Sequence, residues 1–328
     1  MVHMSVMKVE NPPLDTESVC QMHELWVTAF GNDFVSDVPD DVLFGDEDRW
    51  NCVDIYRHIS ERKTISTAIV IRPHALPTLG GLGEVSTDPK FRGQGLATTT
   101  CKQLAEDFHK TGGIALFLGT VNPDAARIYE RLGWQHINGS RLMVHLSDTD
   151  DYDDFIHRYF ANSIPSKICV AKPGCRIPLI PLVLLPHNWS ILDSNVSLYS
   201  TNVEPQLSCL GLYRRYEYLR THCQGEWFTL ITEDERVLGI SSAIYKGDNR
   251  YRVDGFCHPN HEKFFLKLIE TAVDWCKSKE AVEITFKISK QDKSKERLIR
   301  NIGFKTMNEE DYLEPDTMKT QTLLYSKS

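Results

Sequence analysis

Residues 84–97 contain a glycine-rich run of the kind that binds phosphate. Gly93 and Gly95 let the backbone approach a ligand closely, and the sequence predicts a helix that begins directly after them. The unpaired amides of a helix's first turn and the helix dipole both favour an anion. Arg92 places a guanidinium beside the same turn. The run therefore predicts a site for a phosphate-bearing ligand.

The residues on either side of the turn predict the elements that position it. Before the turn, the β-branched Val85 and Thr87 alternate with Glu84 and Ser86, which is the period of a strand. Pro89 lacks a backbone donor and is expected to end that strand. After the turn, one face of the predicted helix is formed by Leu96, Thr100, Leu104 and Phe108.

The spacing excludes two common phosphate-binding motifs. A Walker P-loop needs Lys-Ser/Thr after its last glycine, and none follows Gly95. A dinucleotide fingerprint needs a third glycine where Thr98 stands. The run fits Arg/Gln-x-x-Gly-x-Gly/Ala instead, through Arg92, Gly95 and Ala97. This pattern resembles the acyl-CoA signature of the GNAT superfamily of N-acetyltransferases.

A second segment adds to this resemblance. Residues 114–120 predict a buried strand, and Asn122-Pro123 follows as helix N-cap and first helical residue. The helix is expected to stop at Gly133. The sequence Asn-x-x-Ala-x-x-x-Tyr-Glu-x-Leu-Gly-Trp is similar to the superfamily's second signature. Because the two signatures occur in the family's order, residues 1–146 are identified as a GNAT-like domain.

The resemblance implies acetyl-CoA as co-substrate. Strand residues before the turn would pair with the pantetheine, as an added strand does, and the amides of the turn would bind the pyrophosphate. The alternative for Arg92 is an ordinary surface arginine, and Asn122 has a plain role as the helix N-cap. The implied cofactor-binding residues are Val85, Ser86, Thr87, Arg92, Gly93, Gln94, Gly95, Leu96, Ala97 and Asn122.

Two residues are candidates for the proton transfers of this chemistry. An attacking amine must lose a proton, and the departing thiolate benefits from one. Tyr129 is the candidate acid; alternatively, its ring only packs in the core. Glu84 is the candidate base, directly or through water; alternatively, it is a solvated or salt-bridged strand residue. His136 and His145 are expected to be structural.

The acceptor is expected to be a small-molecule amine. The acidic run 33–48 lies in a region that borders the acceptor site in the family. It would attract a cationic amine, or alternatively form a solvated loop. The net charge of −8 offers no basic surface for nucleic acid. We find no metal-ligand spacing, so no metal is expected.

Composition indicates a two-domain protein of the cytoplasm. The 328 residues suggest about two domains. The nine cysteines are scattered without a Cys-x-x-Cys pair, which favours free thiols in a reducing compartment. The N-terminus lacks the apolar core of a signal peptide. The most apolar run, residues 177–185, is too short to span a bilayer, so no membrane association is expected.

The second half repeats the order of elements of the first. An offset of 170 residues places Asp88-Pro89 on His258-Pro259, and Leu132-Gly133-Trp134 on Ile302-Gly303-Phe304, with no gap between these anchors. We therefore predict an α/β (α+β) fold of two GNAT-like domains in tandem, each a mixed, mostly antiparallel sheet flanked by helices. The expected boundaries are 1–147 for the N-terminal catalytic domain, 148–174 for a linker helix and 175–328 for the second domain.

The second copy lacks the residues that bind acyl-CoA. With the same offset, Lys263 and Phe265 replace the two glycines of the turn, Glu262 replaces the arginine, and Ile299 replaces the tyrosine. Side chains then occupy the space where the backbone must approach a pyrophosphate. The second domain is therefore expected to be degenerate, and to act as a scaffold or to shape the acceptor pocket.

Other elements are predicted from periodicity and from turn residues. In the first half we expect a helix over 16–30, an irregular acidic stretch over 32–48, a strand over 66–72, a loop over 73–81 and the last strands over 135–146. In the second half we expect a hairpin over 227–246, strands over 251–257 and 282–288, and helices over 155–160, 262–277 and 293–301.

These observations predict an N-acetyltransferase that moves an acetyl group from acetyl-CoA to a primary amine by direct attack. Two alternatives stay open. One is a non-catalytic acyl-CoA-binding or sensing protein, and the other is a protein N-acetyltransferase. The sequence also leaves open the length of the acyl group and the oligomeric state.

Overall fold

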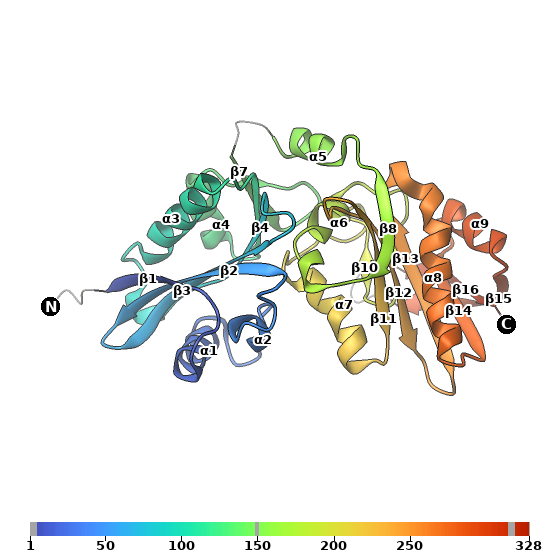
Figure 1. Ribbon diagram of the computed structural model, residues 1–328, viewed down its shortest axis with the longest axis horizontal. Coiled ribbons are helices and arrows are strands. Elements are labelled where there is room, and N and C mark those ends of the chain that lie inside the picture. The colour runs from blue at the N-terminus through green and yellow to red at the C-terminus, as the bar shows by residue number, and fades with distance from the viewer. Residues whose placement is uncertain (1–4, 148–150, 314–318, 328) are drawn as a thin grey trace. The chain divides into compact units, whose positions relative to one another are not determined.

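The computed structural model describes residues 5–147, 151–313 and 319–327. These residues form two compact units, which are described separately (Figure 1). The first unit consists of Met1–Tyr159, Lys172–Pro178 and Gln206–Gly211. The second consists of Phe160–Ala171, Leu179–Pro205 and Leu212–Ser328. Within the described ranges, no helix combines the length and the apolar character of a membrane span.

The first unit is built on a seven-stranded sheet with the order β1-β2-β3-β4-β5-β7-β6. Only β4 and β5 are parallel, as expected for a mixed, mostly antiparallel sheet. The strands are β1 (Val6–Glu10), β2 (Asn51–Ser60), β3 (Lys63–Pro73), β4 (Leu79–Thr87), β5 (Ala115–Gly119), β6 (Gln135–His136) and β7 (Leu142–Leu146). The helices are α1 (Thr16–Phe30), α2 (Asp40–Leu43), α3 (Leu96–Lys110), α4 (Pro123–Arg131) and α5 (Tyr152–Phe160), with a 3-10 turn, η1, at Pro89–Phe91.

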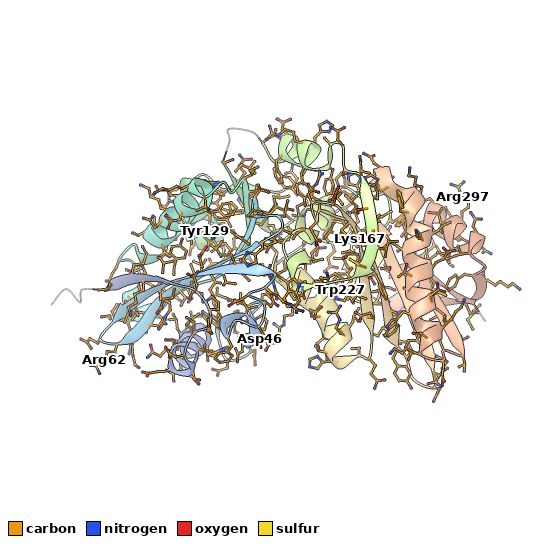
Figure 2. The ribbon with its side chains drawn as sticks, in the orientation of Figure 1. Asp46, Arg62, Tyr129, Lys167, Trp227 and Arg297 are labelled. Carbon is orange, nitrogen blue, oxygen red and sulfur yellow. The ribbon has the colours of Figure 1, made fainter. Side chains whose placement is uncertain are left out.

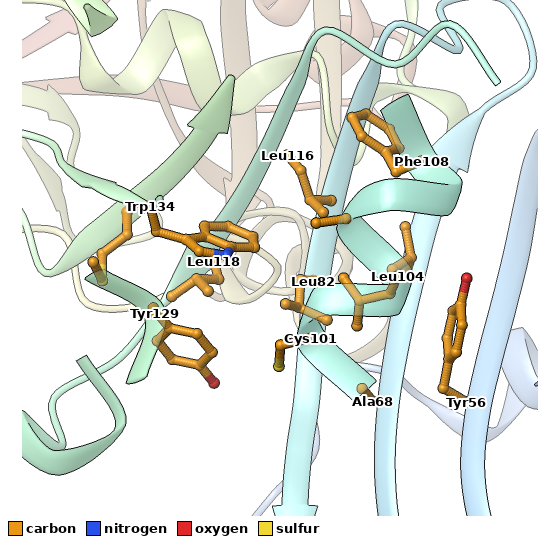
Figure 3. Close-up of a cluster of buried hydrophobic side chains, with 13 residues drawn as sticks. Tyr56, Ala68, Leu82, Cys101, Leu104, Phe108, Leu116, Leu118, Tyr129 and Trp134 are labelled. Atoms are coloured by element: carbon orange, nitrogen blue, oxygen red, sulfur yellow. The ribbon is translucent and has the colours of Figure 1, made fainter. Parts of the chain in front are cut away.

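Helices cover both faces of this sheet, α1 and α2 on one and α3 and α4 on the other (Figure 1). The long helices α1 and α3 each bury an apolar face at helical spacing, and burial of these faces stabilises the unit. Figure 3 shows the cluster under α3 and α4, formed by Tyr56, Ala68, Val70, Leu82, Cys101, Leu104, Ala105, Phe108, Leu116, Leu118, Tyr129, Trp134 and Met143. Gly80 allows close packing here, because a Cβ atom at this position would lie 2.7 Å from the Phe108 ring.

Most predicted elements of this unit form where expected. Helix α1 has the predicted bounds, and the Asp15 side chain caps it by accepting from Ser18 N. Two stretches differ. β4 begins at Leu79, inside the stretch 73–81 that was predicted as a loop, and α2 forms one turn within the acidic stretch 32–48.

Strand β2 was not predicted, because buried polar residues interrupt its apolar pattern. The guanidinium of Arg57 pairs with Glu10 and donates to Thr64 Oγ1. A ring nitrogen of His58 lies 2.9 Å from Thr100 Oγ1. Since these partners come from β1, β3 and α3, the burial of Arg57 and His58 depends on contacts that local sequence does not contain.

The parallel strands β4 and β5 pair over only part of their length. Leu79, Gly80 and Gly81 pair with β5, and no strand of the described residues pairs with the rest of β4 on that side. The register with β3 then shifts, and Glu84 adopts a φ of +52°, which is uncommon outside glycine. This bulge lies in the second half of β4, where the strand has separated from β5. The separation opens a cleft in the middle of the sheet.

The second unit has its own seven-stranded sheet, with the order β15-β16-β14-β13-β12-β11-β8. Again one pair, β13 and β14, is parallel. The strands of this unit are β8 (Pro165–Val170), β9 (Ile191–Asp193), β10 (Leu198–Tyr199), β11 (Glu226–Thr232), β12 (Val237–Tyr245), β13 (Arg250–Cys257), β14 (Glu283–Ser289), β15 (Lys305–Leu313) and β16 (Lys319–Lys327). The helices are α6 (Leu179–Leu184), α7 (Gly211–His222), α8 (Phe265–Ser278) and α9 (Lys293–Asn301).

The offset of 170 residues matches elements of the two units closely. It places α4 on α9 with identical bounds, and α3 on α8 to within two residues at each end. It also places the 3-10 turn after β4 on the 3-10 turn after β13. Asp88 and His258 cap these two turns, each accepting from the amide two residues on. The prediction of two GNAT-like folds in tandem is confirmed at the level of fold.

The repeat also shows which residues of the second unit stand at the positions of the first unit's cavity wall. The positions of Glu84 and Ala125 correspond to Asp254 and Lys295. Lys295 Nζ lies 2.7 Å from Asp254 Oδ1, and both side chains are fully buried. The lysine also donates to the carbonyls of Ile191 and Leu192. An internal ion pair therefore lies where the first unit has a cavity wall.

Candidate active site

The first cavity lies at the start of α3 and is named the glycine-turn cavity. It has a volume of about 570 Å³. Its walls contain every predicted cofactor-binding residue except Gln94, namely Val85, Ser86, Thr87, Arg92, Gly93, Gly95, Leu96, Ala97 and Asn122. The structure thus brings the strand end, the turn and the first turn of α4 to one site.

The glycine turn has the geometry of an anion cradle. Gly93 and Gly95 have φ values of +78° and +79°, which favour glycine. A Cβ atom built at either position would have no heavy atom within 4 Å, so the turn faces open space. The first amides of α3 follow directly and lack intrahelical acceptors. These features fit a pyrophosphate group.

Arg92 and Asn122 both line this cavity. Arg92 is exposed and is oriented by the backbone, since its Nε donates to Thr87 O over 3.2 Å. Asn122 caps α4, and its Oδ1 accepts from Asp124 N over 2.9 Å. The N-cap role expected for Asn122 is therefore present, and the residue also faces the cavity.

Tyr129 lies between this cavity and a second one. It projects from α4, is 6% exposed and lines both cavities. Its ring packs near Trp134, and its hydroxyl points away from the Trp134 ring (Figure 3). Among the described residues the hydroxyl has no hydrogen-bond partner. Burial, with a smaller contribution from Cys101, raises the pKa of Tyr129 well above its usual value, so the phenol stays protonated.

The second cavity, named the carboxylate cavity, has a volume of about 500 Å³. It adjoins the glycine-turn cavity, because both are lined by Phe30, Val85, Asn122, Ala125 and Tyr129. Its own walls add Glu84 and Asp37, the separated halves of β4 and β5, and part of the segment 206–211. The two cavities together run through the cleft between β4 and β5.

Glu84 is held in the wall of the carboxylate cavity by one of its two oxygens. Oε1 accepts from Ser36 Oγ (2.6 Å), Asp37 N (3.0 Å) and Val38 N (3.3 Å). Among the described residues, none donates to Oε2. Burial raises the pKa of Glu84 to about 6, although the three hydrogen bonds oppose the shift. The carboxylate is thus fixed in place and mostly ionised at neutral pH.

The acidic run divides into residues with different surroundings. Asp37 is the one acidic residue of the described run that lines the cavity, together with the apolar Phe34. Asp40 lies 2.7 Å from a ring nitrogen of His23, and Glu47 pairs with the buried Arg176. Asp46 is exposed and lies outside both cavities (Figure 2). The run as a whole therefore does not form the cavity wall.

The segment Gln206–Gly211 of the first unit was not predicted to contribute to this site. It lies along the open edges of β4 and β5: Arg141 N donates to Gln206 O, and Cys209 Sγ lies 3.9 Å from Leu82 O and 3.7 Å from Phe117 O. Three strand glycines make room for it. Added Cβ atoms would lie 2.7 Å and 2.5 Å from Leu210 at Gly81 and Gly83, and 2.6 Å from Leu207 O at Gly119. Glycines inside strands were the available signal, because they mark close approach of another segment.

The two histidines considered as candidates line neither cavity. His145 contacts His109, with 2.7 Å between their ring nitrogens, and also Leu132 O. His136 pairs with Glu130 on the surface. Both take part in local packing around α3, α4 and the last strands.

Comparison with known proteins gives one family match. Residues 55–143 match the model of the FR47-like protein family. This stretch runs from β2 into β7 and contains the glycine turn, Glu84 and Tyr129. A search of curated protein sequences finds no match.

Similar solved structures are acetyltransferases by their titles. A nourseothricin acetyltransferase is 19% identical, with 31% of this chain and 64% of that chain covered and a TM-score of 0.29. A ribosomal-protein-S5-alanine acetyltransferase from Vibrio fischeri is 13% identical, with 50% and 95% covered and a TM-score of 0.40. A Bacillus subtilis acetyltransferase in complex with CoA is 18% identical, with 34% and 78% covered and a TM-score of 0.28.

The assignment rests on the family match and on the cleft. The matched residues include the glycine turn with its two left-handed glycines, the separated parallel strands and the tyrosine that faces both cavities. The stretch 55–143 of the first unit is therefore similar to the FR47-like protein family, and it contains both strands that border the cleft, β4 and β5.

Proposed function

We propose that this protein transfers the acetyl group of acetyl-CoA to a primary amine of a small molecule by direct attack, in the cleft of the first unit. The observation that carries the proposal is the pair of adjoining cavities. Tyr129 faces both of them, and Glu84 faces only the second. A donor held in the first and an acceptor held in the second would meet between an acid and a base.

The glycine-turn cavity would hold the donor. The amides that follow Gly93 and Gly95 would bind its pyrophosphate, with Arg92 beside them. The unpaired edge of β4 at Val85–Thr87 offers backbone groups to an extended chain, as a neighbouring strand would. Acetyl-CoA supplies the activated thioester, and the protein supplies position.

Glu84 would act as the general base. Its Oε2 would accept a proton from the acceptor's ammonium group, which leaves the nitrogen lone pair able to attack the thioester carbonyl carbon. The pKa of about 6 keeps the carboxylate ionised near neutral pH.

Tyr129 would act as the general acid. When the carbon–sulfur bond breaks, its hydroxyl would donate a proton to the departing thiolate. The raised pKa supports this role, because the phenol keeps its proton near neutral pH, where the base is ionised. Its presence in the walls of both adjoining cavities supports this role.

The variant Glu84→Gln tests the assignment of the base. It is expected to lower kcat/KM for the amine about 100-fold or more, the usual contribution of a general base. In the wild type, the rate should fall as pH decreases through about 6, because Oε2 becomes protonated. The variant should lack this acid limb. The measurement is thiol release over about pH 5 to 8, with the best acceptor from a panel of primary amines.

A matched control is Glu24→Gln, which changes an exposed carboxylate of α1 outside both cavities. Its pH profile should be that of the wild type. An unchanged acid limb in Glu84→Gln would contradict the role of Glu84. Acetyl-CoA binding without thiol release for every amine tried would contradict the transferase and favour a non-catalytic acyl-CoA-binding protein.

A further inference from the structure

We infer that the acceptor is a primary amine with an apolar body and no carboxylate group, and that Asp37, held by the segment 206–211, selects it. This inference rests on the proposed function, since it names the substrate class of the carboxylate cavity. It also gives the segment 206–211 a role in specificity.

The wall of the carboxylate cavity has one sign of charge. Glu84 and Asp37 line it, and no lysine, arginine or histidine does so among the residues that the structure describes. Most other wall residues are apolar, namely Phe30, Phe34, Leu82, Val85, Leu118, Val121, Ala125, Leu207 and Leu210. A cation gains from such a wall, whereas a carboxylate would lose its hydration without finding a partner.

Asp37 is held in a defined position beside Glu84. Its backbone N–H donates to Glu84 Oε1 over 3.0 Å. Its Oδ2 accepts from Ser208 Oγ over 2.5 Å, and Gly211 N donates to the same hydroxyl over 3.0 Å. A Cβ atom at Gly211 would lie 3.0 Å from both Asp37 oxygens, so a larger residue there would push the carboxylate out of its present position. The two carboxylates are thus fixed as neighbours in one wall.

The segment 206–211 contributes to recognition of both the ammonium group and the apolar body of the acceptor. Ser208 orients Asp37, which would bind the ammonium group. Leu207 and Leu210 face the same cavity and would contact the apolar body. The segment packs closely on Gly81, Gly83 and Gly119, so its side chains are positioned by contact with β4 and β5.

Matched amines test the substrate class. Phenethylamine and L-phenylalanine differ by one carboxylate, and so do propylamine and 4-aminobutyrate. We expect kcat/KM to be about tenfold or more higher for the member of each pair without a carboxylate, because like charges in a desolvated site cost at least 1.4 kcal/mol. The measurement is thiol release at saturating acetyl-CoA.

Two variants test the residues. Asp37→Asn should raise KM for phenethylamine about tenfold, the usual effect of losing a hydrogen bond to a charged group, while KM for acetyl-CoA stays unchanged. Leu207→Lys, at a side chain that is 48% exposed, adds a cation to the wall. It should reduce the ratio of kcat/KM for phenethylamine to kcat/KM for L-phenylalanine. The control Asp46→Asn removes one charge from the same acidic run outside the cavity and should behave as the wild type.

The outcomes separate this inference from the proposed function. If phenethylamine and L-phenylalanine are acetylated equally well, or if Asp37→Asn keeps the wild-type KM, the inference is wrong while the transferase stands. If the wild type binds acetyl-CoA and acetylates no amine, the proposed function is wrong and the inference falls with it. If Asp37→Asn and Asp46→Asn raise KM for phenethylamine equally, the acidic run attracts the amine at long range and Asp37 does not contact it. This result would also overturn the inference.

Discussion

Replacing Tyr129 by phenylalanine is expected to lower kcat about 100-fold or more, the usual contribution of a general acid. Without the hydroxyl, the thiolate must leave without a proton donor. Binding of acetyl-CoA should be nearly unchanged, because the ring keeps its packing against Trp134. The measurement compares thiol release under saturating substrates with the dissociation constant of acetyl-CoA from titration.

Tyr56→Phe is the matched control. This tyrosine also belongs to the core cluster, but its hydroxyl donates to Asp107 over 3.0 Å and it lines neither of the two cavities. Its kcat should equal that of the wild type. A Tyr129→Phe protein that keeps the wild-type kcat would remove the acid from the mechanism. If the wild type and Tyr129→Phe bind acetyl-CoA equally well and neither acetylates any amine, the protein is a non-catalytic acyl-CoA-binding or sensing protein.

The variant Lys295→Ala is expected to destabilise the second unit by about 3–5 kcal/mol, the cost of leaving a buried charge without its partner. Asp254 would lose the ammonium group at 2.7 Å, and two backbone carbonyls would lose a donor. A second buried carboxylate, Asp193, lies close by; burial, and then the charge on Asp254, raise its pKa to about 7. The lysine therefore stabilises a cluster of two carboxylates. The measurement is the free energy of unfolding in urea.

Lys293→Ala provides the control for this effect. Lys293 pairs with Glu296 on the exposed face of the same helix, α9, so its loss should cost less than about 1 kcal/mol. If Lys295→Ala unfolds at the wild-type urea concentration, the ion pair does not stabilise the second unit.

The parts of the fold that local sequence encodes were predictable. Helix α4 has an asparagine cap, a proline at its first position and a glycine after its end, and its structure follows these signals. The glycine turn was predictable because Gly93 and Gly95 need a backbone conformation that other residues avoid. The repeat was predictable because Asp88 and His258 cap equivalent turns at a constant offset.

The parts that depend on distant segments were not predictable. Strand β2 buries Arg57 and His58 against partners from three other elements. The segment 206–211 reaches the cavity from more than 80 positions beyond the strands it covers, and the glycines of those strands indicate a close neighbour without identifying it. Glu84 was a candidate by its place on a strand, but its single free oxygen depends on three donors at residues 36–38.

Calorimetric titration with acetyl-CoA tests the central claim, that the glycine turn of the first unit is the one donor site. We predict one molecule bound per chain, and no binding to Gly95→Trp, whose side chain would project into the cavity at a φ of +79°. Gly112→Trp is the matched control, because Gly112 has a φ of +90° and open surroundings at the other end of α3. It should bind as the wild type does. Two acetyl-CoA molecules bound per chain, or unchanged acetyl-CoA binding to Gly95→Trp, would contradict a single donor site at the glycine turn.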